Sequence, residues 1–329
     1  MTASRCVAGY KNDRIARRAR ESGNAHRFRE VFQCVVSGMF LCACKATSPI
    51  ATLSPRQITA TMKNNRPSRT AHLVALGRAM ADSGLSHVPH FRDPTARVFL
   101  SEKGKQRLAK TERVARDQTG GLSLEGARTM ANLIALRTTA IDTAVRTALS
   151  AGVKQLVILG AGYDGRAWRM PELAGVRVFE VDHPATQGDK RSRVAELPPA
   201  DSIITFVPIN FERESLGPVL KRAGHDASSP TCWIWEGVVM YLTRDAFSAT
   251  LAAISGRSAP GSTLIVNYHS EHRRFFARLM FRLIGEPQIS AWLPDEMAAD
   301  LQSGGFAVRD DSGMMDWNAR FARGEAKVE

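Results

Sequence analysis

The sequence predicts an α/β fold, in which a mainly parallel sheet with helices on both faces follows an N-terminal helical part. Short apolar runs of strand length recur after Gly152 and alternate with helical or loop segments, which is typical of βαβ units. Before Gly152, apolar residues recur at a spacing of three to four, which is typical of helices. Apolar residues make up 44% and charged residues 23% of the 329 residues, so a disordered or collagen-like chain is excluded.

The helical pattern runs from Arg66 to Leu149. Its last helix has one apolar face, formed by Met130, Leu133, Ile134, Ile141, Val145 and Leu149. Gly152 marks the expected end of this helix. Asp93 and Pro94 mark an earlier helix start, with Asp93 as the cap and Pro94 in the first turn.

Five strands are expected after Gly152. The first is a short continuous apolar run, as expected of a strand that is buried on both faces. The other four have similar lengths, and the expected positions are Leu156–Leu159, Val176–Val181, Ile203–Val207, Cys232–Trp235 and Leu264–Val266.

Residues 1–61 differ in composition from the rest of the chain. Residues 1–60 carry +7 of the total net charge of +13 and most of the cysteines. Val31–Cys44 is apolar, and Leu41–Cys44 resembles a lipoprotein cleavage site. However, the basic region before this run is about 30 residues long, which is longer than the basic region of an ordinary signal peptide. We therefore expect a poorly ordered extension, or a start codon placed too far upstream with Met62 as the natural start.

The remaining residues 62–329 are expected to form one domain, with a helical lid part (62–150) and an α/β cofactor-binding core (151–329). This part is only mildly basic, which gives no support for a nucleic-acid partner. No apolar run has the length of a membrane span. Cys232 is its one cysteine, which suits a reducing cytoplasm. No metal site is expected, because the close histidine pairs lack further ligands nearby, namely His87/His90 and His269/His272.

The most informative motif is the glycine-rich stretch Gly160–Gly165, directly after the first strand. Glycine allows the tight turn and the close approach of a ligand, and the following helix start offers unpaired N–H groups. Asp182 ends the second strand, the usual place for a carboxylate that binds a ribose diol. The literal pattern G-x-G-x-x-G serves dinucleotides, and the same geometry serves S-adenosylmethionine, so this motif leaves both cofactors open.

Several ordered blocks resemble the leucine carboxyl methyltransferase-like family, class I S-adenosylmethionine-dependent methyltransferases that are numerous in actinobacteria. Leu159–Arg169 is similar to the family pattern L-G-A-G-x-D-x-R-x-x-R, Val178–Pro184 to v-F-E-V-D-x-P, and Trp235–Leu242 to E-G-x-x-x-Y-L. Arg66–Ala71 and Arg137–Asp142 resemble the opening of the family and its R-T-x-x-I-D helix. The blocks cover roughly residues 64–315 and are more specific together than a glycine motif alone.

The resemblance implies a Rossmann-like class I methyltransferase sheet with an N-terminal helical lid, and S-adenosylmethionine as the cofactor. The matching positions imply cofactor contacts for seven residues: Arg137 with the methionine carboxylate, Gly160 and Gly162 with the methionine portion, Asp182 with the ribose, Asn210 and Phe211 with the adenine, and Glu236 with the methionine amine.

The chain departs from the family pattern at a few places. Asn210 stands where the family usually has Asp, so its side chain accepts hydrogen bonds without bringing a charge. Tyr163 and Gly165 replace the commoner Leu and Thr. The chain after about Met315 is short, so the last strand is expected to be frayed or incomplete.

The resemblance also implies O-methylation of a carboxylate on a small molecule. A carboxylate is ionised at neutral pH and needs no general base, so no catalytic residue has to be visible. Arg69 and Tyr241 are candidates for orienting an acidic acceptor. The alternatives are a nicotinamide-dependent oxidoreductase, a cofactor-binding protein without turnover, and an RNA methyltransferase. The sequence identifies neither the acceptor nor the oligomeric state.

Overall fold

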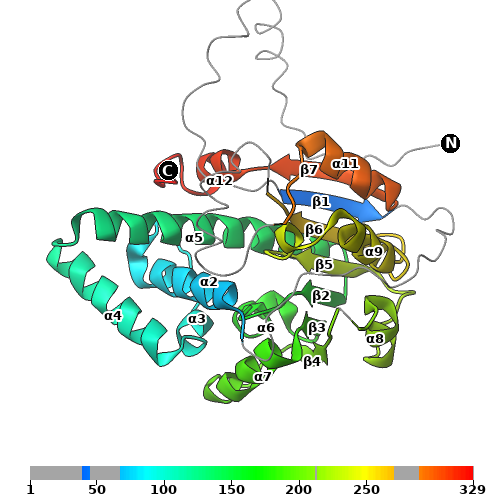
Figure 1. The fold of residues 1–329 in the computed structure, drawn as a ribbon, viewed down its shortest axis with the longest axis horizontal. Helices are drawn as coiled ribbons and strands as arrows, with labels where there is room; N and C mark the ends of the chain where they lie inside the picture. The colour runs from blue at the N-terminus through cyan, green and yellow to red at the C-terminus, as the bar shows by residue number, and fades with distance from the viewer. Residues whose placement is uncertain (1–38, 45–66, 212, 270–288, 329) are drawn as a thin grey trace, which may run out of the picture. The chain divides into compact units, whose positions relative to one another are not determined.

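A sheet of seven strands lies at the centre of the part of the chain that the structure describes (Figure 1). The structure is a computed structural model that describes residues 39–44, 67–211, 213–269 and 289–328. The strand order is β4-β3-β2-β5-β6-β1-β7. The first five strands in this order are parallel to one another. Their bounds are Ile203–Pro208 (β4), Arg177–Asp182 (β3), Gln155–Leu159 (β2), Thr231–Trp235 (β5) and Thr263–Asn267 (β6).

These five parallel strands are the ones that the sequence predicts. Along β2, Leu156 and Ile158 pack into one hydrophobic core, whereas Val157 and Leu159 pack into another on the opposite face. All five residues of β2 are buried, which explains why the strand is a continuous apolar run rather than an alternating one.

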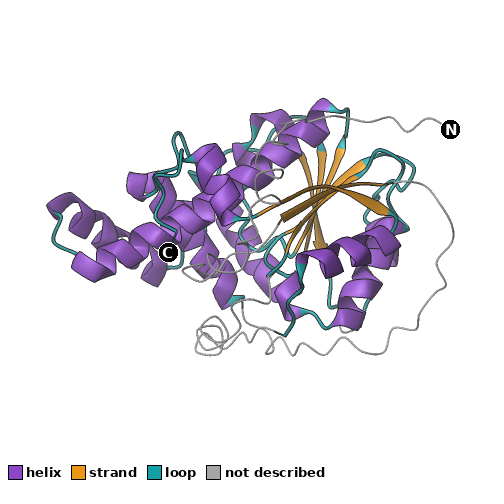
Figure 2. Ribbon diagram, turned by 90° about the horizontal axis from the view of Figure 1, so that it is seen from above, coloured by secondary structure: helices purple, strands orange, loops and turns teal. Residues whose placement is uncertain are grey.

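Helices cover both faces of the sheet, as predicted (Figure 2). The first core contains residues of α2 (Arg69–Met80), α5 (Gly121–Ser150), α6 (Arg166–Arg169) and α12 (Met314–Phe321). The second core contains residues of α8 (Leu216–Arg222), α9 (Arg244–Ser255) and α11 (Pro294–Ser303). The helix after β3 is α7 (Pro184–Arg193).

The described residues from 67 to the beginning of β2 are helical, as predicted. They contain α2, α3 (Thr95–Val98), α4 (Glu102–Asp117) and α5, and Figure 1 shows α4 and the beginning of α5 extending beyond the sheet. Helix α2 packs closely on α5, since a Cβ on Gly77 would lie 2.8 Å from the Ile134 side chain. Helix α3 begins one residue later than predicted, with Pro94 at the N-cap position, and Asp93 Oδ1 accepts a hydrogen bond from the Ala96 N–H at 3.2 Å.

Two strands at one side of the sheet are not predicted from the sequence. They are β1 (Met39–Cys44) and β7 (Phe306–Ser312), and β1 runs antiparallel between β6 and β7. For β1 the structure differs from the expected poorly ordered extension of residues 1–61, because both edges of this strand are paired. Of that segment only β1 is among the described residues, so the domain start at Met62 stays a prediction.

We expect removal of residues 1–61 to lower the melting temperature by at least about 5 °C. A chain that begins at Met62 lacks β1, so β6 and β7 lose the strand that pairs with both of them. Calorimetry should compare the full chain with chains that begin at Val35 and at Met62. Equal melting temperatures for all three chains would instead support a domain that starts at Met62.

Candidate cofactor site

The glycine turn (residues 160–165) follows the carboxyl end of β2 and is hydrogen-bonded to the carboxyl end of β3. Gly160 (φ 66°) and Gly162 (φ 49°) have left-handed backbone conformations that favour glycine. The N–H groups of Gly160 and Ala161 donate to the Val181 carbonyl at 2.8 and 3.1 Å, which fixes the turn against β3. A Cβ on Gly160 would lie 2.3 Å from the Val238 side chain. Backbone conformation and packing therefore both require glycine at position 160.

The two departures in the glycine motif have structural explanations. A Cβ on Gly165 would lie 1.7 Å from Thr95 Oγ1, so α3 leaves no room for a side chain there. The Tyr163 hydroxyl donates to Asp189 of α7 and lies 3.1 Å from His72 Nε2 of α2. Burial and the neighbouring Asp189 raise the pKa of Tyr163, so its hydroxyl stays protonated. Tyr163 thus connects the turn to two helices.

Asp182, the last residue of β3, supports the glycine turn directly. Its carboxylate accepts hydrogen bonds from the Gly162 N–H and, at 2.5 Å, from the His183 N–H. Loss of hydration raises the pKa of Asp182, and the two backbone donors act against this shift. Each carboxylate oxygen can accept a further hydrogen bond, so Asp182 can hold the turn and bind a ligand hydroxyl at the same time.

Glu236, which follows β5, lies among three guanidinium groups. Arg137 Nε of α5 donates to its Oε1 at 2.8 Å, and Arg166 Nη1 donates to its Oε2 at 3.2 Å. Arg78 Nη2 of α2 is 3.4 Å from both oxygens. Burial opposes ionisation of Glu236, but Arg137, Arg78 and Arg166 outweigh burial and hold the pKa of this carboxyl below its usual value.

The predicted pair of Arg137 and Glu236 is therefore brought together by the structure, and the two groups bind each other. Arg137 comes from the middle of α5 and Glu236 from the end of β5, so the docking of α5 on the sheet sets their separation. Both side chains are largely buried, with exposed fractions of 15% and 9%.

Arg166 connects this pair to a second set of charges. Its side chain is fully buried, and it binds Asp142 of α5 at 2.7 Å and Asp164 of the glycine turn. Asp142 also pairs with Arg169 at 2.6 Å. Burial alone would raise the pKa values of Asp142 and Asp164, but the neighbouring arginines, led by Arg169 and Arg166 respectively, lower both. The site is thus built on an ionised, buried network.

Asn210 and Phe211 follow β4 and are partly buried. The Ile209 N–H donates to the Asp182 carbonyl at 2.9 Å, so the chain remains hydrogen-bonded to the end of β3 just before Asn210. Phe211 packs against the second hydrophobic core. The structure therefore places both residues at the same end of the sheet as Asp182.

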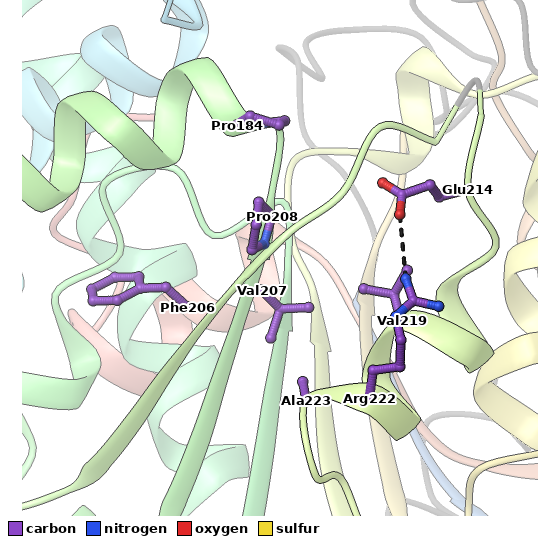
Figure 3. Close-up of a pocket in the computed structure, with 8 residues that line it drawn as sticks. All are labelled: Pro184, Phe206, Val207, Pro208, Glu214, Val219, Arg222 and Ala223. Atoms are coloured by element: carbon purple, nitrogen blue, oxygen red, sulfur yellow. Dashed lines mark hydrogen bonds and ion pairs between the residues drawn. The ribbon is translucent and has the colours of Figure 1, made fainter.

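A cavity of about 480 Å³ lies beside the outer edge of β4 (Figure 3). None of the seven predicted cofactor residues lines it. Figure 3 shows Glu214 and Arg222 beside one another in the lining, and their ion pair is 3.4 Å long. The lining residues are Pro184, Phe206, Val207, Pro208, Glu214, Val219, Arg222 and Ala223. This cavity is therefore separate from the glycine turn and from Glu236.

The two acceptor candidates lie near the first turn of α2. Arg69 is the first residue of this helix and is exposed. The Tyr241 hydroxyl, from the segment after β5, donates to Thr70 Oγ1 at 3.3 Å. The hydrogen bond between Tyr241 and Thr70 thus links the segment after Glu236 to the residue next to Arg69.

Sequence reasoning missed Arg78, which is buried in α2 and contacts Glu236. The available signal was a charged residue inside an apolar helical stretch, between Gly77 and Ala79. Such an arginine is buried only with a partner, but the sequence gives no indication of which carboxylate that partner is.

Two further findings concern the described residues only. They contain no group of three or more His, Cys, Asp or Glu side chains arranged to hold a metal ion. None of the helices among them combines the length and the apolar character that crossing a membrane requires.

We expect Arg166→Met to lower the free energy of unfolding by about 3–5 kcal/mol, because it leaves buried carboxylates without their cation. Arg222→Met is the matched control. Its ion pair with Glu214 is exposed, so its loss should cost less than about 1 kcal/mol. Urea titrations of both variants measure the difference, and equal losses would show that the buried network does not stabilise the fold.

Comparisons with known proteins agree with the resemblance seen in the sequence. The model of the family described as "Leucine carboxyl methyltransferase" matches residues 71–255. A protein of Mycobacteroides abscessus named "Putative S-adenosyl-L-methionine-dependent methyltransferase" is 38% identical over 202 residues, which cover 60% of this chain and 65% of that protein. A protein of Frankia alni with the same description is 35% identical over 195 residues, which cover 59% and 66%.

The match thus spans just under two thirds of the length of these relatives. Among solved structures, the "putative methyltransferase" of Thermobifida fusca is 17% identical, with a TM-score of 0.42 over 73% of this chain and 82% of that chain. The family match covers more than half of the present chain and includes the glycine turn, Asp182 and Glu236. The chain belongs to the leucine carboxyl methyltransferase family.

Proposed function

We propose that the protein transfers a methyl group from S-adenosylmethionine to a carboxylate oxygen of a small molecule. The observation that supports this most directly is the arrangement of the glycine turn, Asp182 and the Arg137–Glu236 pair at the carboxyl ends of adjacent parallel strands. Ligands of open α/β sheets bind at this end of the strands. S-adenosylmethionine supplies an activated methyl group on a sulfonium.

The residues at the ends of β3 and β4 suit an adenosine group. Asp182 has remaining acceptor capacity for the two ribose hydroxyls, while its backbone partners keep it in place. The Asn210 amide can accept a hydrogen bond from the adenine amino group, although it brings no charge. Phe211 offers an apolar surface beside the adenine. We assign these three residues to the adenosine half of the cofactor.

The residues at the end of β5 suit an amino acid that carries both charges. The forked donors of Arg137 match a carboxylate, and the ionised Glu236 matches an ammonium group. The two side chains bind each other at 2.8 Å, which indicates that opposite charges are stable at this position. Gly160 and Gly162 follow β2, next to β5, and we assign them to the methionine portion of the cofactor.

The acceptor is assigned from its chemistry and from the family. A carboxylate with a pKa near 4 is anionic at pH 7 and attacks an activated methyl group without losing a proton. The protein then has to position the acceptor and exclude water. Arg69 and Tyr241 are our candidates for positioning it, since Arg69 begins α2 and the Tyr241 hydroxyl donates to Thr70 in the first turn of this helix.

The other functions considered from the sequence have less support. A nicotinamide-dependent oxidoreductase would use the same glycine turn, but the family match and the names of the relatives point to methyl transfer. A cofactor-binding protein without turnover was suggested by Asn210, and no further observation favours it. Because residues 62–329 are only mildly basic, a small molecule rather than RNA remains the proposed partner.

The protein should bind S-adenosylhomocysteine and not NADH in isothermal titration calorimetry. Asp182→Ala should weaken the binding of S-adenosylhomocysteine by about 1.5–3 kcal/mol, because it removes charge-assisted hydrogen bonds to the ribose. Asp201→Ala, which changes an exposed aspartate before β4, is the control and should leave the affinity unchanged. Tight NADH binding without S-adenosylhomocysteine binding would reverse the assignment of the cofactor.

The product should be a methyl ester. Incubation with radiolabelled S-adenosylmethionine and a small-metabolite extract should give a labelled product that releases volatile methanol in mild alkali. An amine or phenol acceptor usually needs a placed base, and its methylated product keeps the label under these conditions. Label that stays on the acceptor would exclude carboxyl methylation.

A further inference from the structure

We propose that Arg78 is a positioning residue of the cofactor site. It holds Glu236 in place for the ammonium group of S-adenosylmethionine when Arg137 leaves Glu236 for the carboxylate of the cofactor. This inference rests on the proposed function. It assigns a role to a residue of α2 that lies outside the sequence blocks on which the resemblance to the family rests.

The contacts of Arg78 indicate that its donors are incompletely used. Its side chain is only 5% exposed, yet Nη2 lies 3.4 Å from each oxygen of Glu236 and Nη1 lies 3.4 Å from the Tyr163 carbonyl. Its Nε is buried and has no hydrogen-bond partner. These distances are longer than those of strong charge-assisted hydrogen bonds, so Arg78 can bind Glu236 more tightly when a competing partner leaves.

The three arginines around Glu236 differ in the other carboxylates with which they pair. Arg166 has Asp142 and Asp164 as partners besides Glu236. In the described part of the chain, the ion pairs of Arg78 and of Arg137 are both formed with Glu236. The ion pairs of the whole cluster are balanced in charge, because four arginines (Arg78, Arg137, Arg166 and Arg169) pair with four carboxylates (Asp93, Asp142, Asp164 and Glu236). An amino-acid group with one charge of each sign therefore adds no net charge to the cluster.

An amino-acid group can exchange with the Arg137–Glu236 ion pair. Arg137 would bind the ligand carboxylate and Glu236 would bind the ligand ammonium, so each charge keeps an opposite charge beside it. Glu236 loses its 2.8 Å contact with Arg137 in this exchange. The groups that still fix the Glu236 carboxylate are then Arg78 and Arg166.

The position of α2 makes Arg78 a rigid support. At the start of this helix the Ser68 N–H donates to Thr186 Oγ1 of α7 at 3.3 Å. A Cβ on Gly162 would lie 3.2 Å from the Ala71 Cβ, so α2 also packs directly on the glycine turn. The helix is thus held by contacts near the proposed adenosine half of the site, and it presents Arg78 to the amino-acid half.

The test compares two ligands that differ only at the amino-acid group. S-adenosylhomocysteine has this group, whereas 5′-methylthioadenosine has the adenosine and the thioether without it. In calorimetry, Arg78→Met should raise the Kd of S-adenosylhomocysteine about 10- to 100-fold, the size expected for lost contacts to a charged group. The Kd of 5′-methylthioadenosine should change less than about threefold.

Arg257→Met is the control for the loss of a partly buried arginine. Arg257 hydrogen-bonds to the carbonyl and to Nδ1 of His225, and His225 contacts Thr231 at the amino-terminal end of β5, away from Glu236. Its loss should leave the ratio of the two Kd values unchanged. Arg78→Lys keeps a positive charge near Glu236 and replaces Arg78→Met in the test if that variant does not fold. It should raise the Kd of S-adenosylhomocysteine about 3- to 10-fold.

The route through Glu236 is tested by a double-mutant cycle. In a Glu236→Gln background, Arg78→Met should change the Kd of S-adenosylhomocysteine less than about threefold, because the group it positions is no longer charged. The proposal is overturned if the Arg78 variants weaken both ligands equally or neither of them. If the unaltered protein binds neither ligand, the proposed function itself fails, and the role of Arg78 fails with it.

Discussion

The complete burial of the Arg166 guanidinium is the constraint on which the rest of the site depends. A buried charge without partners would cost several kcal/mol. Its carboxylate partners come from three separate elements, since Asp142 belongs to α5, Asp164 to the glycine turn and Glu236 to the end of β5. These elements cannot move apart without exposing or unpairing the charge, so the helix, the turn and the strand are fixed relative to one another.

This network also explains how one set of residues can serve both the fold and a ligand. Asp142 and Asp164 neutralise Arg166 at short range, whereas its contact with Glu236 is longer, at 3.2 Å. Glu236 can therefore interact with a ligand while Arg166 keeps two carboxylates. The two charges that we assign to an amino-acid group thus lie side by side in the structure, and their ion pair at 2.8 Å has to open when that group binds.

The sequence predicts most of the fold, because the signals for the parallel strands are local. Strands β2 to β6 are short apolar runs, and the core residues on both of their faces explain these runs. The strand β7 lacks such a signal, since Arg309, Asp310 and Asp311 lie within it. The strand β1 is part of a longer apolar run in a basic segment, so its composition does not distinguish a strand from a signal-like sequence.

Residue patterns alone predict the candidate site only where a residue and its role are close in the sequence, whereas Arg137 and Glu236, 99 positions apart, come from the resemblance to the family. Gly160 and Gly162 follow from the turn after β2, and Asp182 follows from its place at the end of β3. Arg78 and Glu236 are 158 positions apart, and their contact depends on how α2 docks against α5 and the glycine turn. Because no local pattern encodes this docking, the part that α2 has in the charge network of the site does not follow from the sequence.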